Sequence, residues 1–394
     1  MNKLFIIANW MQGKALSGGD RIFIELSNRW SQKLDISIFL SKEGAYICRR
    51  EGLNPINQSI WTSDIFSGHY LVDGIYRIII GIFKVLWMKT YKGDIVLSSS
   101  DFLPDTIPAF ILKLKNPKVK WIASFYLFAP KPWQKNSPYK GIKYLLGFIY
   151  WLSQLPAYYI IKYFADIVFV TSQPDVKLFI TKNRKENKII VVRGGVDTSP
   201  AIKYFEQGNF ISIENRYYDA CFVGRFHYQK GVLELIRIWK VVCNKKPKCR
   251  LALIGMGPLE GEIQSLIKQM GLKTNITLLG FLNGTEKFNV FKQSKIVLHP
   301  ATYDSGGMAP AEAMAWGLPG VSFDLEALKS YYPKGILKTE CFNLDAFANN
   351  ILHLLSDPNA HLALSQEALA LVKEQWNWDQ QAQNILHQVT TVLD

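Results

Sequence analysis

The sequence lacks the patterns that mark several common kinds of site. Its five cysteines form no C-x-x-C pair and no cluster with histidine, so we expect neither a zinc site nor a disulfide framework, and a reducing cytoplasm suits the chain. The sequence contains no D-x-D triplet, and IGMGPLEG has the spacing G-x-G-x-x-x-G without a P-loop lysine. That spacing disfavours dinucleotide and ATP sites. The apolar stretch within MNKLFIIANW is too short for a signal peptide and is expected to be a buried strand.

Acidic residues are scarce in the first half of the chain. Residues 1–195 contain 27 lysines and arginines against 13 aspartates and glutamates, whereas residues 196–394 contain 19 of each. The whole net charge of +14 therefore lies in the first half, which points to an anionic surface or ligand, either acidic lipid or nucleic acid. No nucleic-acid recognition module is recognisable, so nucleic acid is not expected as a partner.

Short apolar runs alternate with helical patterns along the chain. The strand candidates are KLFIIAN, ISIFLS, DIVLSSS, KWIASF and DIVFVTS in the first half, and DACFVG, RLALIG, NITLLG and KIVLHP in the second. This alternation predicts an α/β fold with parallel sheets, whose ligands bind beyond the carboxyl ends of the strands. A chain of 394 residues fits two such domains. We expect them at 1–196 and 197–375, with a final helix at 376–394 that crosses back to the first domain.

Two segments of the first half, 76–89 and 131–164, mix basic and aromatic residues. Residues 144–161 carry no charge and reach the length of a membrane span, but a serine, a glutamine and a proline interrupt them. We expect an amphipathic element in the interface of an anionic membrane, where each lysine contributes about 1 kcal/mol. A buried helix pair and a true span are the alternatives. The residues expected to meet the membrane or the acceptor are Lys131, Trp133, Lys135, Lys140 and Lys143.

Four loops carry the chemistry that the sequence offers. SGGDR at 17–21 and the glycine pair Gly306 and Gly307, with Met308, each lead into a predicted helix, where main-chain N–H groups can approach an anion. VGRFHYQKG at 223–231 places two cations after a strand, which suits a departing diphosphate. The fourth loop is IGMGPLEG. Together they predict a binding site for a phosphorylated ligand.

The stretch TYDSGGMAPAEAMAWGLPG resembles the signature of the family 4 retaining glycosyltransferases of the GT-B fold. That signature is an acid, seven residues, a glutamate and then A-M-A-x-G-x-P, and here Asp304 and Glu312 hold the acidic positions. The motifs VTSQPDVKLF, IIVVRGGVD, FVGRFHYQKG, LIGMGP, LLGFL and WNWD extend the resemblance over nearly the whole chain, most specifically in its second half. The resemblance implies two Rossmann-like domains whose parallel sheets face each other across a cleft.

The activity that the resemblance implies is a retaining, metal-independent hexosyl transfer from a nucleoside diphosphate sugar, with no cofactor. From the basic aromatic segments of the first half, we expect the acceptor to be a lipid-linked saccharide, a glycolipid or a polysaccharide precursor. The enzyme is then expected to be cytoplasmic and attached peripherally to the inner face of the cell membrane. By position, Arg225 and Lys230 would stabilise the leaving diphosphate, and Asp304 would contact the hydroxyls of the donor sugar. The residues expected to bind the donor are Gly18, Gly19, Gly224, Gly306, Gly307, Met308 and Glu312.

Two departures from the family pattern leave other functions open. The family usually has glutamate where this chain has Asp304, and many relatives have a histidine where this chain has Phe125 or Tyr126. The alternatives are a non-catalytic, glycosyltransferase-like scaffold that docks a partner enzyme on the membrane, and an epimerase of the related fold. The sequence leaves the roles of His227 and His299 undecided.

Overall fold

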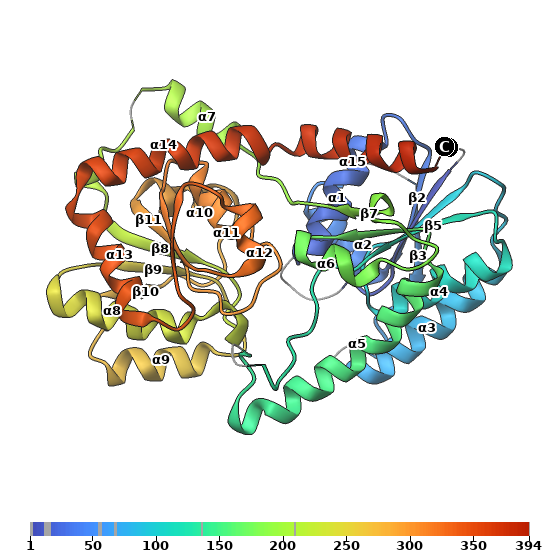
Figure 1. Cartoon of the computed structure of the whole chain (residues 1–394), viewed down its shortest axis with the longest axis horizontal. Coiled ribbons are helices and arrows are strands. Elements are labelled where there is room, and N and C mark those ends of the chain that lie inside the picture. The colour runs from blue at the N-terminus through green and yellow to red at the C-terminus, as the bar shows by residue number, and fades with distance from the viewer. Residues whose placement is uncertain are drawn as a thin grey trace. The chain divides into compact units, whose positions relative to one another are not determined.

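The computed structural model describes residues 3–11, 17–53, 57–66, 69–134, 137–208 and 210–393. The chain divides into two compact units. The first groups the described residues of Met1–Ala129, Phe148–Gly194 and Trp378–Asp394, and the second those of Pro130–Gly147 and Gly195–Asn377. Each unit is an α/β structure built on one parallel sheet (Figure 1).

The first unit contains a seven-stranded sheet in the order β3-β2-β1-β4-β5-β6-β7. Its strands are β1 (Leu4–Ala8), β2 (Ile36–Ser41), β3 (Asn57–Thr62), β4 (Ile95–Ser98), β5 (Lys120–Ser124), β6 (Ile167–Val170) and β7 (Ile189–Val191). Its helices are α1 (Gly18–Trp30), α2 (Lys42–Arg50), α3 (Tyr70–Trp87), α4 (Leu103–Lys115), α5 (Tyr144–Phe164), α6 (Gln173–Phe179) and α15 (Trp378–Leu393), with short 3-10 turns at Gly141–Lys143 and Glu186–Lys188. The first four residues of α5 group with the second unit.

The central strands of this sheet are apolar because helices cover both faces. In β1, Leu4, Ile6 and Ala8 point into a core shared with α1, α2 and α15, whereas Phe5 and Ile7 point into a core shared with α3, α4, α5 and α6. Figure 1 shows α3, α4 and α5 together on one side of this sheet. The five strands expected from the apolar runs of the first half are present. The two additional strands, β3 and β7, form the edges of the sheet, and four of the six residues of β3 are exposed.

The second unit contains a six-stranded sheet in the order β10-β9-β8-β11-β12-β13. Its strands are β8 (Tyr218–Val223), β9 (Leu251–Ile254), β10 (Ile276–Leu278), β11 (Ser294–His299), β12 (Gly320–Phe323) and β13 (Ile336–Thr339). Its helices are α7 (Ser199–Glu206), α8 (Val232–Lys245), α9 (Glu260–Gln269), α10 (Gly284–Lys292), α11 (Ala309–Met314), α12 (Glu326–Tyr331), α13 (Leu344–Ser356) and α14 (Pro358–Gln375), with 3-10 turns at Ile213–Asn215 and Tyr228–Lys230.

Helices cover both faces of the second sheet as well. One core packs α8, α9 and α13 against the sheet, and the other packs α10, α11, α12 and α14 against its opposite face (Figure 1). The expected alternation of strands and helices in the second half is therefore confirmed. The four strand candidates there correspond to β8, β9, β10 and β11.

Candidate active site

Two loops of the second unit meet because β8 and β11 are parallel neighbours. We call residues 224–231, which follow β8, the donor loop, after the role that the family resemblance implies for them. The loop after β11 is tied to it by hydrogen bonds from the backbone N–H groups of Thr302 and Tyr303 to the carbonyl oxygen of Gln229, at 3.0 and 3.3 Å. Gly231 has a φ of 63°, and a Cβ there would lie 1.8 Å from the carbonyl oxygen of Pro300, so only glycine lets the loops approach this closely.

An ion pair joins the two loops. Lys230 Nζ lies 2.6 Å from Asp304 Oδ2, and His299 Nε2 lies 3.4 Å from the same carboxylate oxygen. The other oxygen of Asp304 accepts backbone hydrogen bonds from Ser305 at 2.9 Å and from Gly306 at 3.4 Å. The side chain of Asp304 is 8% exposed and that of Lys230 is 29% exposed. The carboxylate is therefore enclosed, whereas the ammonium group still reaches solvent.

This environment fixes the charge of Asp304. Burial by itself would raise the pKa of the carboxyl group, but the charge of Lys230 and the adjacent His299 outweigh burial and hold the pKa of Asp304 well below its usual range. Asp304 therefore stays ionised at physiological pH. The ionised carboxylate holds the ammonium group of Lys230 in place through the ion pair.

The glycine pair packs against Asp304, His299 and two tyrosines, and the sequence did not single out the tyrosines. A Cβ on Gly306 would lie 2.2 Å from the ring of Tyr331, and a Cβ on Gly307 would lie 2.6 Å from Asp304 Oδ2 and 2.7 Å from the ring of His299. The hydroxyl of Tyr332 donates to the carbonyl of Gly307. The loop therefore has no room for a side chain at either glycine. The residues around the glycine pair do not predict the tyrosine contacts, because both tyrosines belong to a later segment of the chain.

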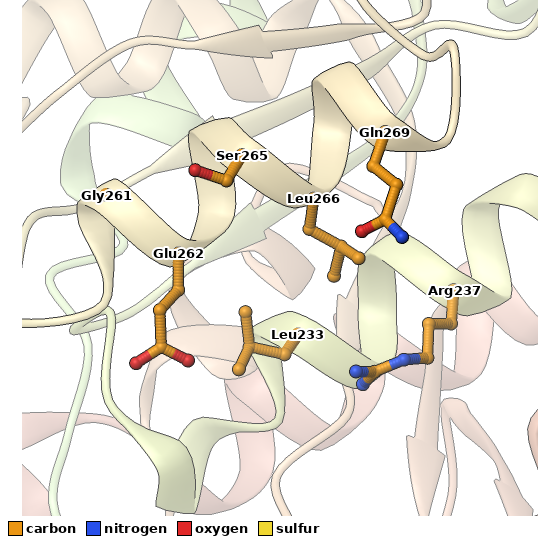
Figure 2. Close-up of a pocket in the computed structure, with 7 residues that line it drawn as sticks. All are labelled: Leu233, Arg237, Gly261, Glu262, Ser265, Leu266 and Gln269. Atoms are coloured by element: carbon orange, nitrogen blue, oxygen red, sulfur yellow. The ribbon is translucent and has the colours of Figure 1, made fainter.

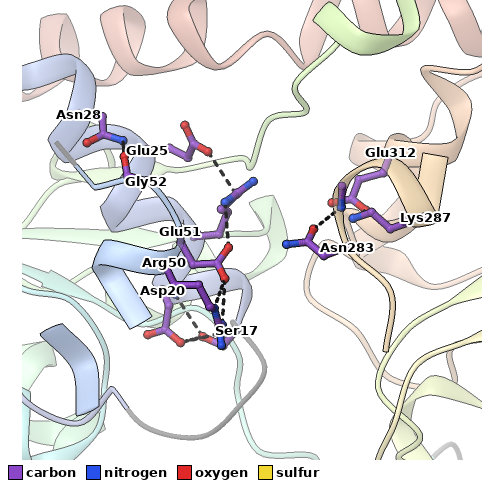
Figure 3. Close-up of polar contacts among 12 residues, drawn as sticks. Ser17, Asp20, Glu25, Asn28, Arg50, Glu51, Gly52, Asn283, Lys287 and Glu312 are labelled. Carbon is purple, nitrogen blue, oxygen red and sulfur yellow. Dashed lines mark hydrogen bonds and ion pairs between the residues drawn. The ribbon is translucent and has the colours of Figure 1, made fainter. Parts of the chain in front are cut away.

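A second ion pair lies farther along the same segment. Lys287 on α10 places Nζ 2.7 Å from Glu312 Oε2 on α11, and Asn283 caps the beginning of α10 (Figure 3). Glu312 is 35% exposed at its side chain. Lys287 was not predicted as a site residue, because a lone lysine on a helix has no distinguishing pattern. The structure brings Glu312 to Lys287 and Asp304 to Lys230, so the two acids of the signature hold different cations.

Arg225 is exposed at the other end of the donor loop. Burial first, and then the charges of Arg225 and Lys230, lower the pKa of His227 to about 4, so this imidazole is neutral at physiological pH. Gly224 is held close to the loop after β9, since a Cβ on Gly255 would lie 1.9 Å from its carbonyl oxygen. Met308 stands directly before α11. The donor loop thus presents two cations, Arg225 and Lys230, on a tightly packed backbone.

The glycine pair of the first unit lies at the beginning of α1. Ser17 and Asp20 form a reciprocal capping box there (Figure 3). A Cβ on Gly19 would lie 2.7 Å from the ring of Tyr126, whereas Gly18 has nothing within 4 Å. Of the two residues considered in place of the family's histidine, Tyr126 is therefore the one beside the glycines. Phe125 is buried in the core of the unit.

The expected membrane residues have different surroundings. Lys131 and Trp133 are exposed, and Lys135 lies outside the described residues. Lys140 Nζ lies 5.2 Å from the centre of the Phe342 ring, and Lys143 Nζ lies 3.2 Å from that of Tyr228. The two last lysines thus contact aromatic rings of the second unit.

Large apolar side chains are exposed on α3 and α5. On α3, Leu71 is 85% and Trp87 is 86% exposed. The other exposed apolar residues of these helices are Tyr70, Val72, Ile75, Ile79, Phe83, Leu86, Tyr144, Leu145, Leu146, Phe148, Ile149, Leu152, Tyr159, Tyr163 and Phe164. Over the described parts of the chain, no helix is both long enough and apolar enough to traverse a bilayer. Gln154, in the middle of α5, binds Asp101 and the backbone of residues 127 and 129, which explains a polar residue in this apolar helix.

Comparison with known proteins places these loops in a family context. Residues 206–370, which contain both ion pairs, match the family model for glycosyl transferases group 1. A glycosyltransferase of unassigned specificity from Methanocaldococcus jannaschii is 27% identical over 213 residues, covering 50% of this chain and 52% of that protein. The gpi3 subunit of the phosphatidylinositol N-acetylglucosaminyltransferase of Schizosaccharomyces pombe is 22% identical over 156 residues, covering 40% of this chain and 34% of that protein. The match thus spans about half of the first relative and a third of the second.

Solved structures match the chain over nearly its whole length. Anabaena HepE in complex with UDP and glucose has a TM-score of 0.72 at 15% identity, covering 99% of this chain and all of that one. The UDP-forming trehalose-phosphate synthase of Burkholderia xenovorans, in complex with glucose-6-phosphate, has a TM-score of 0.72 at 11% identity, with 99% and 100% covered. The fold is GT-B. The expected GT-B architecture is confirmed by these neighbours and by the two parallel sheets, and the group 1 match falls in the second unit of this GT-B chain.

Proposed function

We propose that the protein transfers a hexose from a nucleoside diphosphate sugar to a membrane-presented acceptor, with retention of configuration and without a metal ion. The observation that carries this proposal is the pairing of Lys230 with Asp304, at a glycine loop after β11. The group 1 family match and the GT-B fold support a glycosyltransferase. The family resemblance of the signature supports retention.

In this proposal, cationic side chains of the donor loop stabilise the departing diphosphate. Lys230 has three N–H donors, and Asp304 orients its ammonium group from one side, which leaves the other donors for phosphate oxygens. Arg225 is exposed on the same loop and adds a second positive charge. Charges that are fixed before the reaction stabilise the leaving group without reorganisation in the transition state.

The signature acids have distinct tasks in this scheme. Asp304 stays ionised and positions Lys230, and in addition contacts hydroxyl groups of the donor sugar. Glu312, held by Lys287 at 2.7 Å, accepts hydrogen bonds from the ribose. We propose a uridine nucleotide as the donor, because the HepE structure contains UDP and the trehalose-phosphate synthase is UDP-forming.

The membrane part of the proposal is supported by the exposed apolar side chains of α3 and α5. An amphipathic surface of this kind can lie in the bilayer interface, where lysines add attraction to acidic lipid. One relative is named for transfer to phosphatidylinositol and another is a poly(glycerol-phosphate) alpha-glucosyltransferase. We propose a lipid-linked or polymeric saccharide acceptor, reached from the inner face of the cell membrane.

A thermal-shift screen with UDP-, GDP-, ADP- and dTDP-sugars tests the donor proposal. A bound ligand at 100 times its dissociation constant should stabilise the protein by about 2.7 kcal/mol. Lys230→Ala should abolish the shift. Lys334→Ala, which removes a surface ion pair with Glu374 in the same unit, should not, because exposed pairs contribute about 0–1 kcal/mol. No shift with any donor would contradict the proposal.

Liposome flotation tests the membrane part. The double variant Leu71→Ser/Trp87→Ser removes two of the most exposed apolar side chains of α3 and should reduce binding to anionic vesicles. Leu362→Ser, a control on α14 where the side chain is 52% exposed, should leave binding unchanged. Equal flotation on neutral and anionic vesicles would rule out the charge-assisted attachment.

A further inference from the structure

The segment Pro130–Gly147, which we call the strap, belongs to the second unit although the chain on either side of it belongs to the first. It is anchored by buried residues: Ser137 is 2% and Tyr139 is 8% exposed. A Cβ on Gly147 would lie 2.6 Å from the side chain of Tyr139, so the first turn of α5 packs directly on this ring. The described residues of the strap therefore pack as part of the second unit.

The strap contacts the donor loop through one ring. Lys143 Nζ lies 3.2 Å from the centre of the Tyr228 ring, and the hydroxyl of Tyr228 donates to Glu262 Oε1 on α9 at 2.7 Å. Tyr228 begins the 3-10 turn that ends at Lys230. Because Tyr228 is held by an ammonium group on its face and a carboxylate at its hydroxyl, the orientation of the turn is constrained from both ends of the side chain.

A further contact holds the strap on the second unit. Lys140 Nζ lies 5.2 Å from the ring centre of Phe342, in the second unit. Burial raises the pKa of Tyr139, and the charge of Arg225, the other cation of the donor loop, opposes that rise. Glu262 in turn lines a shallow groove of about 400 Å³ between α8 and α9, together with Leu233 and Leu266 (Figure 2).

The hydroxyl of Tyr228 is a stable donor. Burial, and then the hydrogen bond and charge of Glu262, raise its pKa to about 12. The phenol is therefore neutral at physiological pH, and its hydrogen bond to the carboxylate persists. The face of the neutral ring attracts the ammonium group of Lys143 through its quadrupole.

We propose that Lys143 is a positioning residue for donor binding, which acts through the Tyr228 ring to hold the turn that carries Lys230. This inference rests on the proposed function, since it takes the donor loop to be the diphosphate site. Lys143 itself does not contact the donor. It orders the loop before binding, so its loss lowers donor affinity because part of the binding free energy then orders the loop.

Calorimetric titration with UDP tests this inference. Lys143→Met should raise the dissociation constant of UDP about threefold to tenfold, the range of a partly desolvated cation–ring contact. Lys143→Arg keeps a cation over the ring and should stay within about twofold of the wild type. Tyr228→Leu should weaken UDP binding similarly, and adding Lys143→Met to it should cause little further loss, because the two residues act as one unit.

The matched control is Lys162→Met. Lys162 Nζ also lies over a tyrosine ring, 5.2 Å from the centre of Tyr158, but in the first unit. It should leave UDP affinity unchanged, and the melting temperatures of both lysine variants without UDP should stay close to that of the wild type. A purely structural role for Lys143 would lower the melting temperature and leave the affinity of the folded protein intact.

The outcomes separate the two proposals. If the wild type binds UDP and Lys143→Met binds it equally well, the positioning role is wrong and the donor site stands. The same conclusion follows if Lys143→Arg fails to rescue affinity, or if the effects of Lys143→Met and Tyr228→Leu are additive. If the wild type does not bind UDP, the proposed uridine donor and the positioning inference both fail.

Discussion

Replacing Lys230 by methionine should destabilise the second unit by an amount that depends on pH. The substitution keeps most of the length of the side chain and removes the charge that faces Asp304 at 2.6 Å. Asp304 is 8% exposed, so its carboxylate would remain enclosed after the substitution. The imidazole of His299 would still lie 3.4 Å from it. An enclosed carboxylate without its cation is costly.

The size of the effect follows from the geometry. At 2.6 Å and an effective dielectric constant of about 20, the gross attraction between the two charges is about 6 kcal/mol. Desolvation offsets much of this, and removing one partner of a fully buried pair costs about 3–5 kcal/mol. Because 29% of the Lys230 side chain is exposed, solvent screens part of the interaction. We therefore expect Lys230→Met to lower the free energy of unfolding by about 2–3 kcal/mol at pH 7.

The pH dependence has a definite sign. The pKa of Asp304 in the folded protein is depressed below its ordinary value, so its ion pair stabilises the fold above the unfolded pKa of about 3.9. That contribution is lost as the pH falls toward the folded pKa. In Lys230→Met the pKa of Asp304 should rise, because burial is no longer outweighed. The difference between wild type and variant should therefore be largest near pH 7 and should narrow as the pH falls through the raised pKa of the Asp304 carboxyl group in the variant.

Urea unfolding followed by tryptophan fluorescence, at pH 7 and pH 3.5, measures this difference. Asp304→Asn and the double variant Lys230→Met/Asp304→Asn complete a double-mutant cycle. The double variant should be more stable than Lys230→Met alone, because it no longer encloses an unpaired carboxylate. A cost of Lys230→Met that is equal at both pH values, or a cycle with no coupling free energy, would refute the ion pair as described.

Other substitutions test the packing around the two sites. Gly307→Ala should destabilise the protein by about 1–3 kcal/mol and weaken UDP binding, because its Cβ would lie 2.6 Å from Asp304 Oδ2. Gly261→Ala is the control, since a Cβ there has nothing within 4 Å. It should leave stability in urea unchanged or raise it, and it should leave UDP binding unchanged. Arg77→Met should cost about 3–5 kcal/mol in urea unfolding, since it strands the buried carboxylate of Asp73, whose Oδ2 lies 2.8 Å from Arg77 Nε. Burial raises the pKa of Asp105 to about 7. Between about pH 4 and pH 7 the unfolded chain therefore releases this proton while the folded chain retains it. The wild type should lose stability relative to Asp105→Asn as the pH rises through this range. A constant difference across that range would contradict the raised pKa.

Much of the fold could be predicted because its signals are local. Strands such as β1 and β11 appear as continuous apolar runs, since helices cover both faces of a parallel sheet. β3 could not be predicted, because four of its six residues are exposed at the sheet edge. The sequence pattern predicts one amphipathic element at 131–164. The structure instead contains the strap, held by the second unit, followed by most of α5 in the first, because contacts distant in sequence decide where each part packs.

The sequence could predict which residue types form the candidate site, but it could not predict which charged residues pair with one another. Glycines before helices and cations after a strand indicate an anion site by local chemistry alone, and the sequence by itself determined these, together with the α/β class. Only the tertiary structure decided that Lys230 holds Asp304, 74 residues away, that Lys287 holds Glu312, and that Lys143 lies on Tyr228. The physical reason is that such partners are brought together by strand order and helix packing, as β11 lies beside β8 in the sheet. The residues next to a charged side chain in the sequence contain no information about strand order or helix packing.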